Sequence, residues 1–129
     1  MTDNSDDEVQ WNKAAEKLIE LTRSGQVRWM PEQLQLRPGM KDFVGPQYAA
    51  EFMNRKIAVY EYEFTLTHQF QFGHIGGGKL SRVMIEFVDE STERIWVWPT
   101  SVEVRERLLE AIQYQVANPT EFLEALLSS

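Results

Sequence analysis

The alternation of side chains from residue 57 to residue 66 constrains the fold of this chain more than any other feature. Two sets of residues alternate along it, and the more aromatic set is Ala58, Tyr60, Tyr62, Phe64 and Leu66. Successive side chains of a β-strand project to opposite faces of a sheet, so a period of two over ten residues predicts a strand. Because an isolated strand is not stable, this stretch requires neighbouring strands and a layer that buries one face.

The surrounding sequence supplies those neighbours. β-branched and aromatic residues recur at 80–88 and 93–98, and the polar turn 89–92 separates the two runs. These patterns predict three antiparallel strands between residues 56 and 98. Upstream, residues 26–30 and 48–53 predict two further strands. The stretch 33–45 between them predicts only a turn, at Pro38-Gly39.

Helical periodicity marks both ends of the chain. Apolar residues spaced by three and four positions predict a helix at about 7–24 and another at about 100–117. Pro119 suits the first turn of a third helix. We expect the apolar residues of this third helix to complete the core, and they are Phe122, Leu123, Leu126 and Leu127. The predicted fold class is therefore α+β, with an N-terminal helix, an antiparallel meander of four to five strands and two C-terminal helices on one face.

One segment resembles a known layout. The sequence LTRSGQVRW at 21–29, preceded by Trp11, is similar to the opening of small uncharacterised bacterial domains. In these domains a helix ends in a Thr-x-Ser-Gly turn before a Trp-bearing strand. The similarity continues to residues 95–99 and the C-terminal helices. It implies a bacterial source and the same layout, and it implies no activity.

The length of 129 residues predicts a single domain. Four of the first eight residues are acidic, and we expect residues 1–6 to form a disordered acidic tail. Three consecutive glycines at 76–78 lose much backbone entropy on ordering. We therefore expect residues 67–79 to form a mobile hairpin arm.

Charge and composition limit the classes of partner. The formal net charge is −7, which argues against nucleic acid or an anionic membrane as a partner and is compatible with a basic protein. The absence of cysteine excludes disulfides and thiolate sites and fits a reducing compartment. The first ten residues lack the apolar core of a signal peptide, and the sequence holds no run that could span a membrane. We expect a cytoplasmic location.

The two histidines are poor candidates for a metal site. His68 and His74 lie six residues apart, which on a continuous strand separates them by about 20 Å. One metal ion cannot bridge that distance. The run of glycines followed by Lys79 lacks the spacing and the following helix of a phosphate-binding loop. We predict neither a metal nor a cofactor.

Carboxylates are more numerous, but ion pairing explains them. Glu61 and Glu63 share one face of their predicted strand, and Glu86 could lie nearby. Like charges held together raise a carboxyl pKa and can create a general acid. However, Arg82 and Arg94 are expected on the same face, where they would form cross-strand salt bridges with these carboxylates. We predict no catalytic residue.

The tryptophans of the last strand allow two registers. If Ile95 and Val97 face the helices, Trp96 and Trp98 lie on an open sheet face as anchors for a partner. In the opposite register both tryptophans belong to the core.

The expected arm offers a second surface for a partner. Phenylalanines alternate there with glutamines and approach the glycines, a pattern that does not suit a compact core. The candidate partner-binding residues of the arm and the sheet face together are Phe70, Phe72, His74, Trp96, Trp98, Arg82 and Arg94.

These observations favour a non-catalytic, acidic protein-interaction module over an enzyme. Toxin-neutralising (immunity) proteins and secretion chaperones share its size and acidity. A protein partner or a second copy of the chain would cover the aromatic sheet face or the arm. The alternative is a small-ligand-binding protein or an enzyme, with a pocket lined by Tyr60, Tyr62, Trp96 and either His68 or His74.

Overall fold

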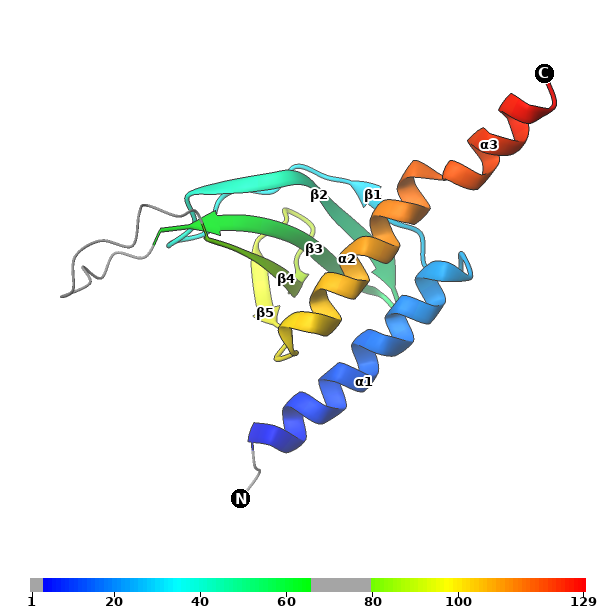
Figure 1. The fold of residues 1–129 in the computed structure, drawn as a ribbon. Helices are drawn as coiled ribbons and strands as arrows, with labels where there is room; N and C mark the ends of the chain where they lie inside the picture. Colours follow the sequence, from blue (N-terminus) through cyan, green and yellow to red (C-terminus); the bar gives the residue numbers. More distant parts are fainter. Residues whose placement is uncertain (1–3, 66–79) are drawn as a thin grey trace, which may run out of the picture.

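A computed structural model describes residues 4–65 and 80–129, with side chains from residue 7 onward. Five strands form one antiparallel sheet in meander order, with one helix before it and two after it (Figure 1). This confirms the predicted α+β class. The elements are α1 (Asn4–Arg23), β1 (Met30–Pro31), β2 (Asp42–Phe52), β3 (Arg55–Phe64), β4 (Leu80–Val88), β5 (Arg94–Val97), α2 (Val102–Ala117) and α3 (Pro119–Leu127).

The expected tail is described only in part. Helix α1 begins at Asn4, inside the segment for which we expected a disordered tail. The whole of the expected arm, residues 67–79, lies outside the described residues, as do residues 66 and 1–3. The register of β3 and β4 is nevertheless clear, because Phe64 pairs with Leu80 and Lys56 with Val88 at the two ends of the ladder.

A tight turn joins β2 to β3. Met53 and Asn54 both have positive φ, of 53° and 62°, and Phe52 pairs with Arg55 across them. Two successive left-handed residues are the geometry of a type I′ hairpin turn, which matches the twist of the strands. Asparagine tolerates this conformation well, whereas methionine does not. The Met53 side chain is 80% exposed at the tip of this turn.

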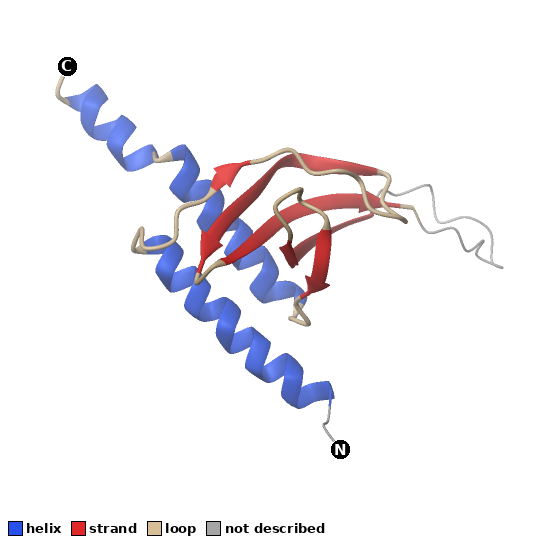
Figure 2. Cartoon of the chain, turned by 180° about the vertical axis from the view of Figure 1, so that it is seen from behind, coloured by secondary structure: helices blue, strands red, loops and turns tan. Residues whose placement is uncertain are grey.

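Helices α1 and α2 lie side by side on one face of the sheet, as both views show (Figures 1 and 2). The core between the layers consists mainly of Leu18 and Ile19 of α1, Leu108 and Ile112 of α2, and Val59 and Ile85 of the sheet, together with Trp98. The observed register therefore puts Trp98 and Trp96 on the helix-covered face. The open aromatic sheet face does not form, and the second of the two registers is the observed one.

A polar joint holds α1 and α2 together at one end. The Gln115 side chain of α2 donates to the backbone carbonyls of Thr22 and Val27 at 2.8 and 2.7 Å and accepts from the Trp29 backbone N–H at 2.8 Å. The Trp29 indole donates to the Thr22 hydroxyl at 2.9 Å. The last carbonyls of a helix have no partner within the helix, and here a neighbouring helix supplies one.

The other face of the sheet is covered by the chain between β1 and β2. Leu34 and Met40 from this segment pack on Ala58, Tyr60 and Met84. The predicted turn at Pro38-Gly39 is present, since the Met40 N–H donates to the Arg37 carbonyl at 3.1 Å and Gly39 has a φ of 88°. This is the geometry of a type II turn, which requires glycine at its third position. The turn places Arg37 over the sheet.

Helix α3 departs from the prediction. It continues the direction of α2 with a bend and projects beyond the sheet, away from both layers (Figure 1). Every residue of α3 is exposed, so the expectation that its apolar residues complete the core is wrong. The reason is its position: α2 already reaches the end of the helix layer at Gln115, and α3 begins past that point. The exposed residues are Phe122 (68%), Leu123 (52%), Leu126 (57%) and Leu127 (76%).

Candidate functional site

The predicted site residues lie in different parts of the molecule. Phe70, Phe72 and His74, as well as His68, lie outside the described residues, so their role stays a prediction. Trp96 and Trp98 lie on the helix-covered face, and Arg82 and Arg94 on the opposite one. These seven residues do not form one described site.

Trp96 and Trp98 belong to an aromatic cluster with Trp11 of α1. The ring of Trp11 lies 4.9 Å from that of Trp96 and 4.8 Å from that of Trp98, and Phe87 stacks on Trp96 at 6.4 Å. Trp98 is 6% exposed and Trp96 is 43% exposed. Trp98 is therefore a core residue, whereas Trp96 keeps part of its ring at the surface of an edge strand.

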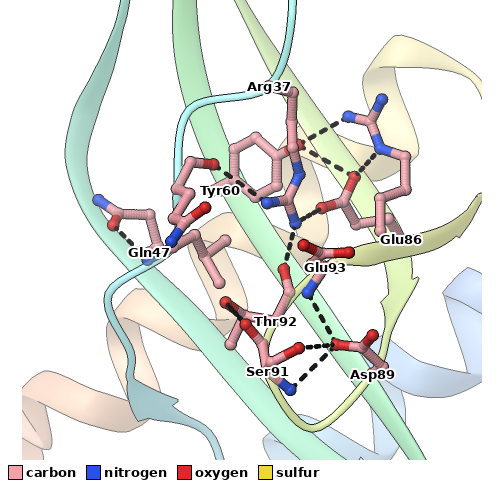
Figure 3. A network of polar contacts seen from close by, with 11 residues as sticks. Arg37, Gln47, Tyr60, Glu86, Asp89, Ser91, Thr92 and Glu93 are labelled. Atoms are coloured by element: carbon pink, nitrogen blue, oxygen red, sulfur yellow. Dashed lines mark hydrogen bonds and ion pairs between the residues drawn. The ribbon is translucent and has the colours of Figure 1, made fainter.

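A buried carboxylate lies on the opposite face. The Glu86 side chain is fully buried and accepts from Arg37 at 2.8 Å, from Arg94 at 2.5 Å and from the Tyr60 hydroxyl at 3.0 Å (Figure 3). Arg94 also donates to the Tyr60 oxygen at 3.0 Å, and Arg37 donates to the Thr92 carbonyl at 2.7 Å. We call Arg37, Tyr60, Glu86 and Arg94 the Glu86 cluster.

The sequence predicted only part of the Glu86 cluster. Pairing of Glu86 with Arg94 follows from the predicted strands, and the contact is present. Arg37, 49 positions before Glu86, comes from a loop for which no pattern gave a direction. Glu61 and Glu63 alternate with Tyr60 and Tyr62 and so lie on the other face from Glu86. Glu61 and Glu63 do share a face as predicted, but the expectation that Glu86 and its arginines lie on that face is wrong.

The electrostatics of the cluster favour a structural role. Burial, together with the charge of Glu86, raises the pKa of the Tyr60 phenol above its usual range. Burial alone would lower the pKa of Arg94, but the hydrogen bond and charge of Glu86 raise it overall. Tyr60 thus stays a donor and Arg94 a cation. Glu86 is fully buried and both its carboxylate oxygens accept hydrogen bonds, which favours a structural role over proton transfer to a substrate.

Arg82 is not part of this cluster. Its guanidinium lies over the Phe64 ring, 5.0 Å from the centroid, in a cation–π contact. Glu61 instead accepts from the Ser81 hydroxyl at 2.7 Å on the other face. The predicted salt bridges of Arg82 with these glutamates are not among the contacts of the described residues.

The alternative aromatic pocket does not form as proposed. Tyr60 is buried on the loop-covered face and Trp96 lies on the helix-covered face, so the sheet separates them. A cleft of about 550 Å³ lies instead between the end of α1 and α2, where Arg23, Arg28 and Glu110 line it. Within residues 4–65 and 80–129, no group of three or more metal-ligating side chains is placed to hold a metal ion.

No described segment covers the apolar face of α3 or an apolar groove beside α1. The apolar face of α3 is formed by Phe122, Leu123, Leu126 and Leu127, and we call it the α3 face. The groove, of about 250 Å³, lies between α1 and the sheet end that carries the β2–β3 turn. Leu18 and Leu21 of α1, Met53 of the turn and Phe87 of β4 are among its lining residues. We call it the α1 groove.

The sequence pattern of α3 predicts a core helix, and its apolar residues were expected to be buried. The signal for exposure was weak, because the α3 face has the same spacing as the buried stripe of α2. One cue was available in Asn118-Pro119, which predicts a break and a change of direction after α2.

No protein-family model, curated protein or solved structure matches this chain. Among the residues that the structure describes, no helix combines the length and apolarity needed to cross a membrane.

Proposed function

We propose that this protein is a non-catalytic protein-interaction module that presents α3 to a partner. The observation that carries the proposal is the exposure of all four large apolar residues of the α3 face, at 52–76%. Leaving one such side chain in water forgoes roughly 1.5–3 kcal/mol relative to burial. Four on one short helix indicate a surface that is covered in the functional state.

The shape of α3 supports this role. Phe122, Leu123, Leu126 and Leu127 lie at positions i, i+1, i+4 and i+5, so they share one side of the helix. Glu121 and Glu124 lie on the other side, by the same periodicity. An amphipathic helix of this kind is a common recognition element, because its apolar face fills a groove while its polar face remains in water.

The joint between α2 and α3 supports presentation in a defined direction. Asn118 adopts a left-handed conformation, with φ of 48°, and Pro119 follows at the first position of α3. The Tyr114 and Thr120 hydroxyls are 2.8 Å apart across the bend. Proline lacks the N–H that would continue α2, so the bend is built into the backbone. The α3 face is therefore held away from the chain's own sheet.

The test is a capture experiment with three baits. Wild type is compared with a Phe122→Ser, Leu126→Ser variant and with a control carrying Glu121→Ser and Glu124→Ser. Both variants have two serines in α3, so any loss of helix propensity is matched. We expect wild type and control to associate with the same protein, or with a second copy, and the α3-face variant to lose it. Equal association by all three baits, or by none, would contradict the proposal.

A further inference from the structure

The cleft of about 550 Å³ between the end of α1 and the second half of α2, which we call the α1–α2 cleft, has the size of a ligand site. Small-molecule sites usually measure about 300–1,000 Å³. The lining residues Thr22 and Gln115 are held in place by the polar joint that connects the two helices. The cleft therefore has a fixed inner wall, and a ligand can enter it without a change in the fold.

The two arginines that line this cleft, Arg23 and Arg28, differ from the other arginines of the chain. The sequence holds eight arginines. Six of them have a described partner, which is Glu86 for Arg37 and Arg94, Glu16 for Arg107, a phenylalanine ring for Arg55 and Arg82, and backbone carbonyls for Arg105. Within residues 4–65 and 80–129, Arg23 and Arg28 alone have no hydrogen-bonding, ionic or aromatic partner, and both are exposed in the same cleft.

A shortage of acids does not explain these two unpaired side chains. The sequence holds 20 acidic residues against 13 basic ones. Glu110 lines the same cleft, yet it forms no ion pair with either arginine among the described contacts. The Arg28 guanidinium lies beside the turn that ends α1, because its Nη2 atom is 3.8 Å from the position of a Cβ added at Gly25. Both guanidinium groups are thus available to a molecule in the cleft.

From these observations we propose that the α1–α2 cleft binds a small organic molecule through an oxyanion, a carboxylate or phosphate group, that Arg23 and Arg28 hold. A guanidinium group presents five N–H donors in a planar fork, which matches the oxygens of these two groups. The Tyr114 side chain is 60% exposed in the cleft and offers a ring surface to the rest of the molecule. This site goes beyond the proposed function, because it does not involve the α3 face.

Titration of the full chain with three small probes tests the proposal, with amide chemical shifts as the readout. Phenyl phosphate and benzoate carry the two kinds of oxyanion on the same ring, and benzyl alcohol carries no charge. We expect saturable shifts at residues 22–28 and 110–118 with at least one of the two anions. The anion that binds more tightly identifies the oxyanion. Equal affinity for benzyl alcohol would overturn the role of the charged group.

Charge-removing substitutions locate the binding groups. Arg23→Gln and Arg28→Gln should each weaken binding of the tighter anion by about tenfold, because each removes hydrogen bonds to a charged group. Neither arginine has a described partner, so the thermal unfolding midpoint should not change. Glu110→Gln removes a negative charge from the cleft and should strengthen anion binding. The matched control, Arg107→Gln, removes the same charge from an arginine of α2 that pairs with Glu16, and should leave the affinity unchanged.

Two further results would overturn the proposal. One is the absence of saturable shifts at the cleft with both anions at millimolar concentration. The other is equal weakening by all three arginine variants, which would mean that general charge attraction holds the anion. The Phe122→Ser, Leu126→Ser variant should bind the anions as tightly as wild type, so the failure of this site and the failure of the proposed function are distinguishable.

Discussion

The Glu86 cluster and the α3 face reverse the usual distribution of side chains, each in its own way. Around Glu86, charged groups are buried, and each carboxylate oxygen has a donor at 3.0 Å or less. On α3, large apolar groups are in water. The first arrangement is closed within one chain, because two arginines pair with the buried carboxylate, although the buried Arg37 Nε has no hydrogen-bond partner among the described residues. The second is incomplete, because apolar surface is stabilised only when something covers it.

This contrast separates structural from functional residues. A buried charge attracts attention as a possible catalytic group, but pairing with two arginines is the usual condition for burying one at all. An exposed leucine on its own is unremarkable, but four on one helix face are not. In this protein the more conspicuous chemistry holds the fold, and the simpler surface is the candidate for function.

Among the substitutions considered, Glu86→Ala is expected to lower the unfolding free energy most. Removing the carboxylate leaves Arg37 and Arg94 partly buried without their counter-charge, which should cost about 3–5 kcal/mol of unfolding free energy. Urea denaturation measures this cost. Glu106→Ala, which removes an acidic charge from an exposed position of α2, serves as the control and should change stability by less than about 0.5 kcal/mol. Similar costs for the two variants would mean that the Glu86 cluster does not stabilise the fold.

The next comparison uses one chemical change on two neighbouring helices. Leu108 of α2 is fully buried, so Leu108→Ala should cost about 2–5 kcal/mol. Leu126→Ala should change the monomer by less than about 0.5 kcal/mol, because this side chain is already in water. Thermal and urea unfolding at low protein concentration distinguish them. A large cost at Leu126 in the monomer would place α3 in the core after all.

Substituting the two arginines of the Glu86 cluster should lower the unfolding free energy by different amounts. The Arg37 side chain is 9% exposed and also bonds the Thr92 carbonyl, whereas Arg94 is 32% exposed. We expect Arg37→Met to cost about 2–3 kcal/mol and Arg94→Met about 1 kcal/mol, since solvent screens the second pair. When either arginine substitution is combined with Glu86→Gln, the cost in unfolding free energy should differ markedly from the sum of the two single costs. The reverse order would show that loop anchoring by Arg37 contributes little.

The smallest expected effect on stability is that of Asp89, an acidic residue outside the Glu86 cluster. Asp89 accepts from the Glu93 backbone N–H and from Ser91, which lowers its carboxyl pKa below the usual range. A lowered folded-state pKa stabilises the fold above the unfolded pKa of about 3.9, and this contribution disappears as the pH falls through the folded value. The stability difference between wild type and Asp89→Asn should therefore shrink below about pH 4. A difference independent of pH would contradict the assignment.

Local patterns predicted most elements of this fold, but the strand expected at 26–30 is reduced to Met30–Pro31, and β2 begins at Asp42 rather than at residue 48. Alternation over 57–66 predicted β3, and the periodic apolar stripes predicted α1 and α2, because each pattern reflects one element facing one layer. The turn at Pro38-Gly39 was also predictable, since it needs only the backbone preferences of those two residues. The register of the last strand was not, because both faces of residues 95–98 carry large apolar side chains.

The sequence by itself therefore determined the order of the helices and strands and that one side of each strand and long helix must be covered. Tertiary structure alone decided what covers each side. Arg37 meets Glu86 across 49 positions only because the loop is folded back over the sheet. The apolar face of α3 has the spacing of a core helix, yet it lies past the end of the sheet. Periodicity is a property of a single helix, whereas burial requires a second surface, and residues 4–65 and 80–129 supply none for α3.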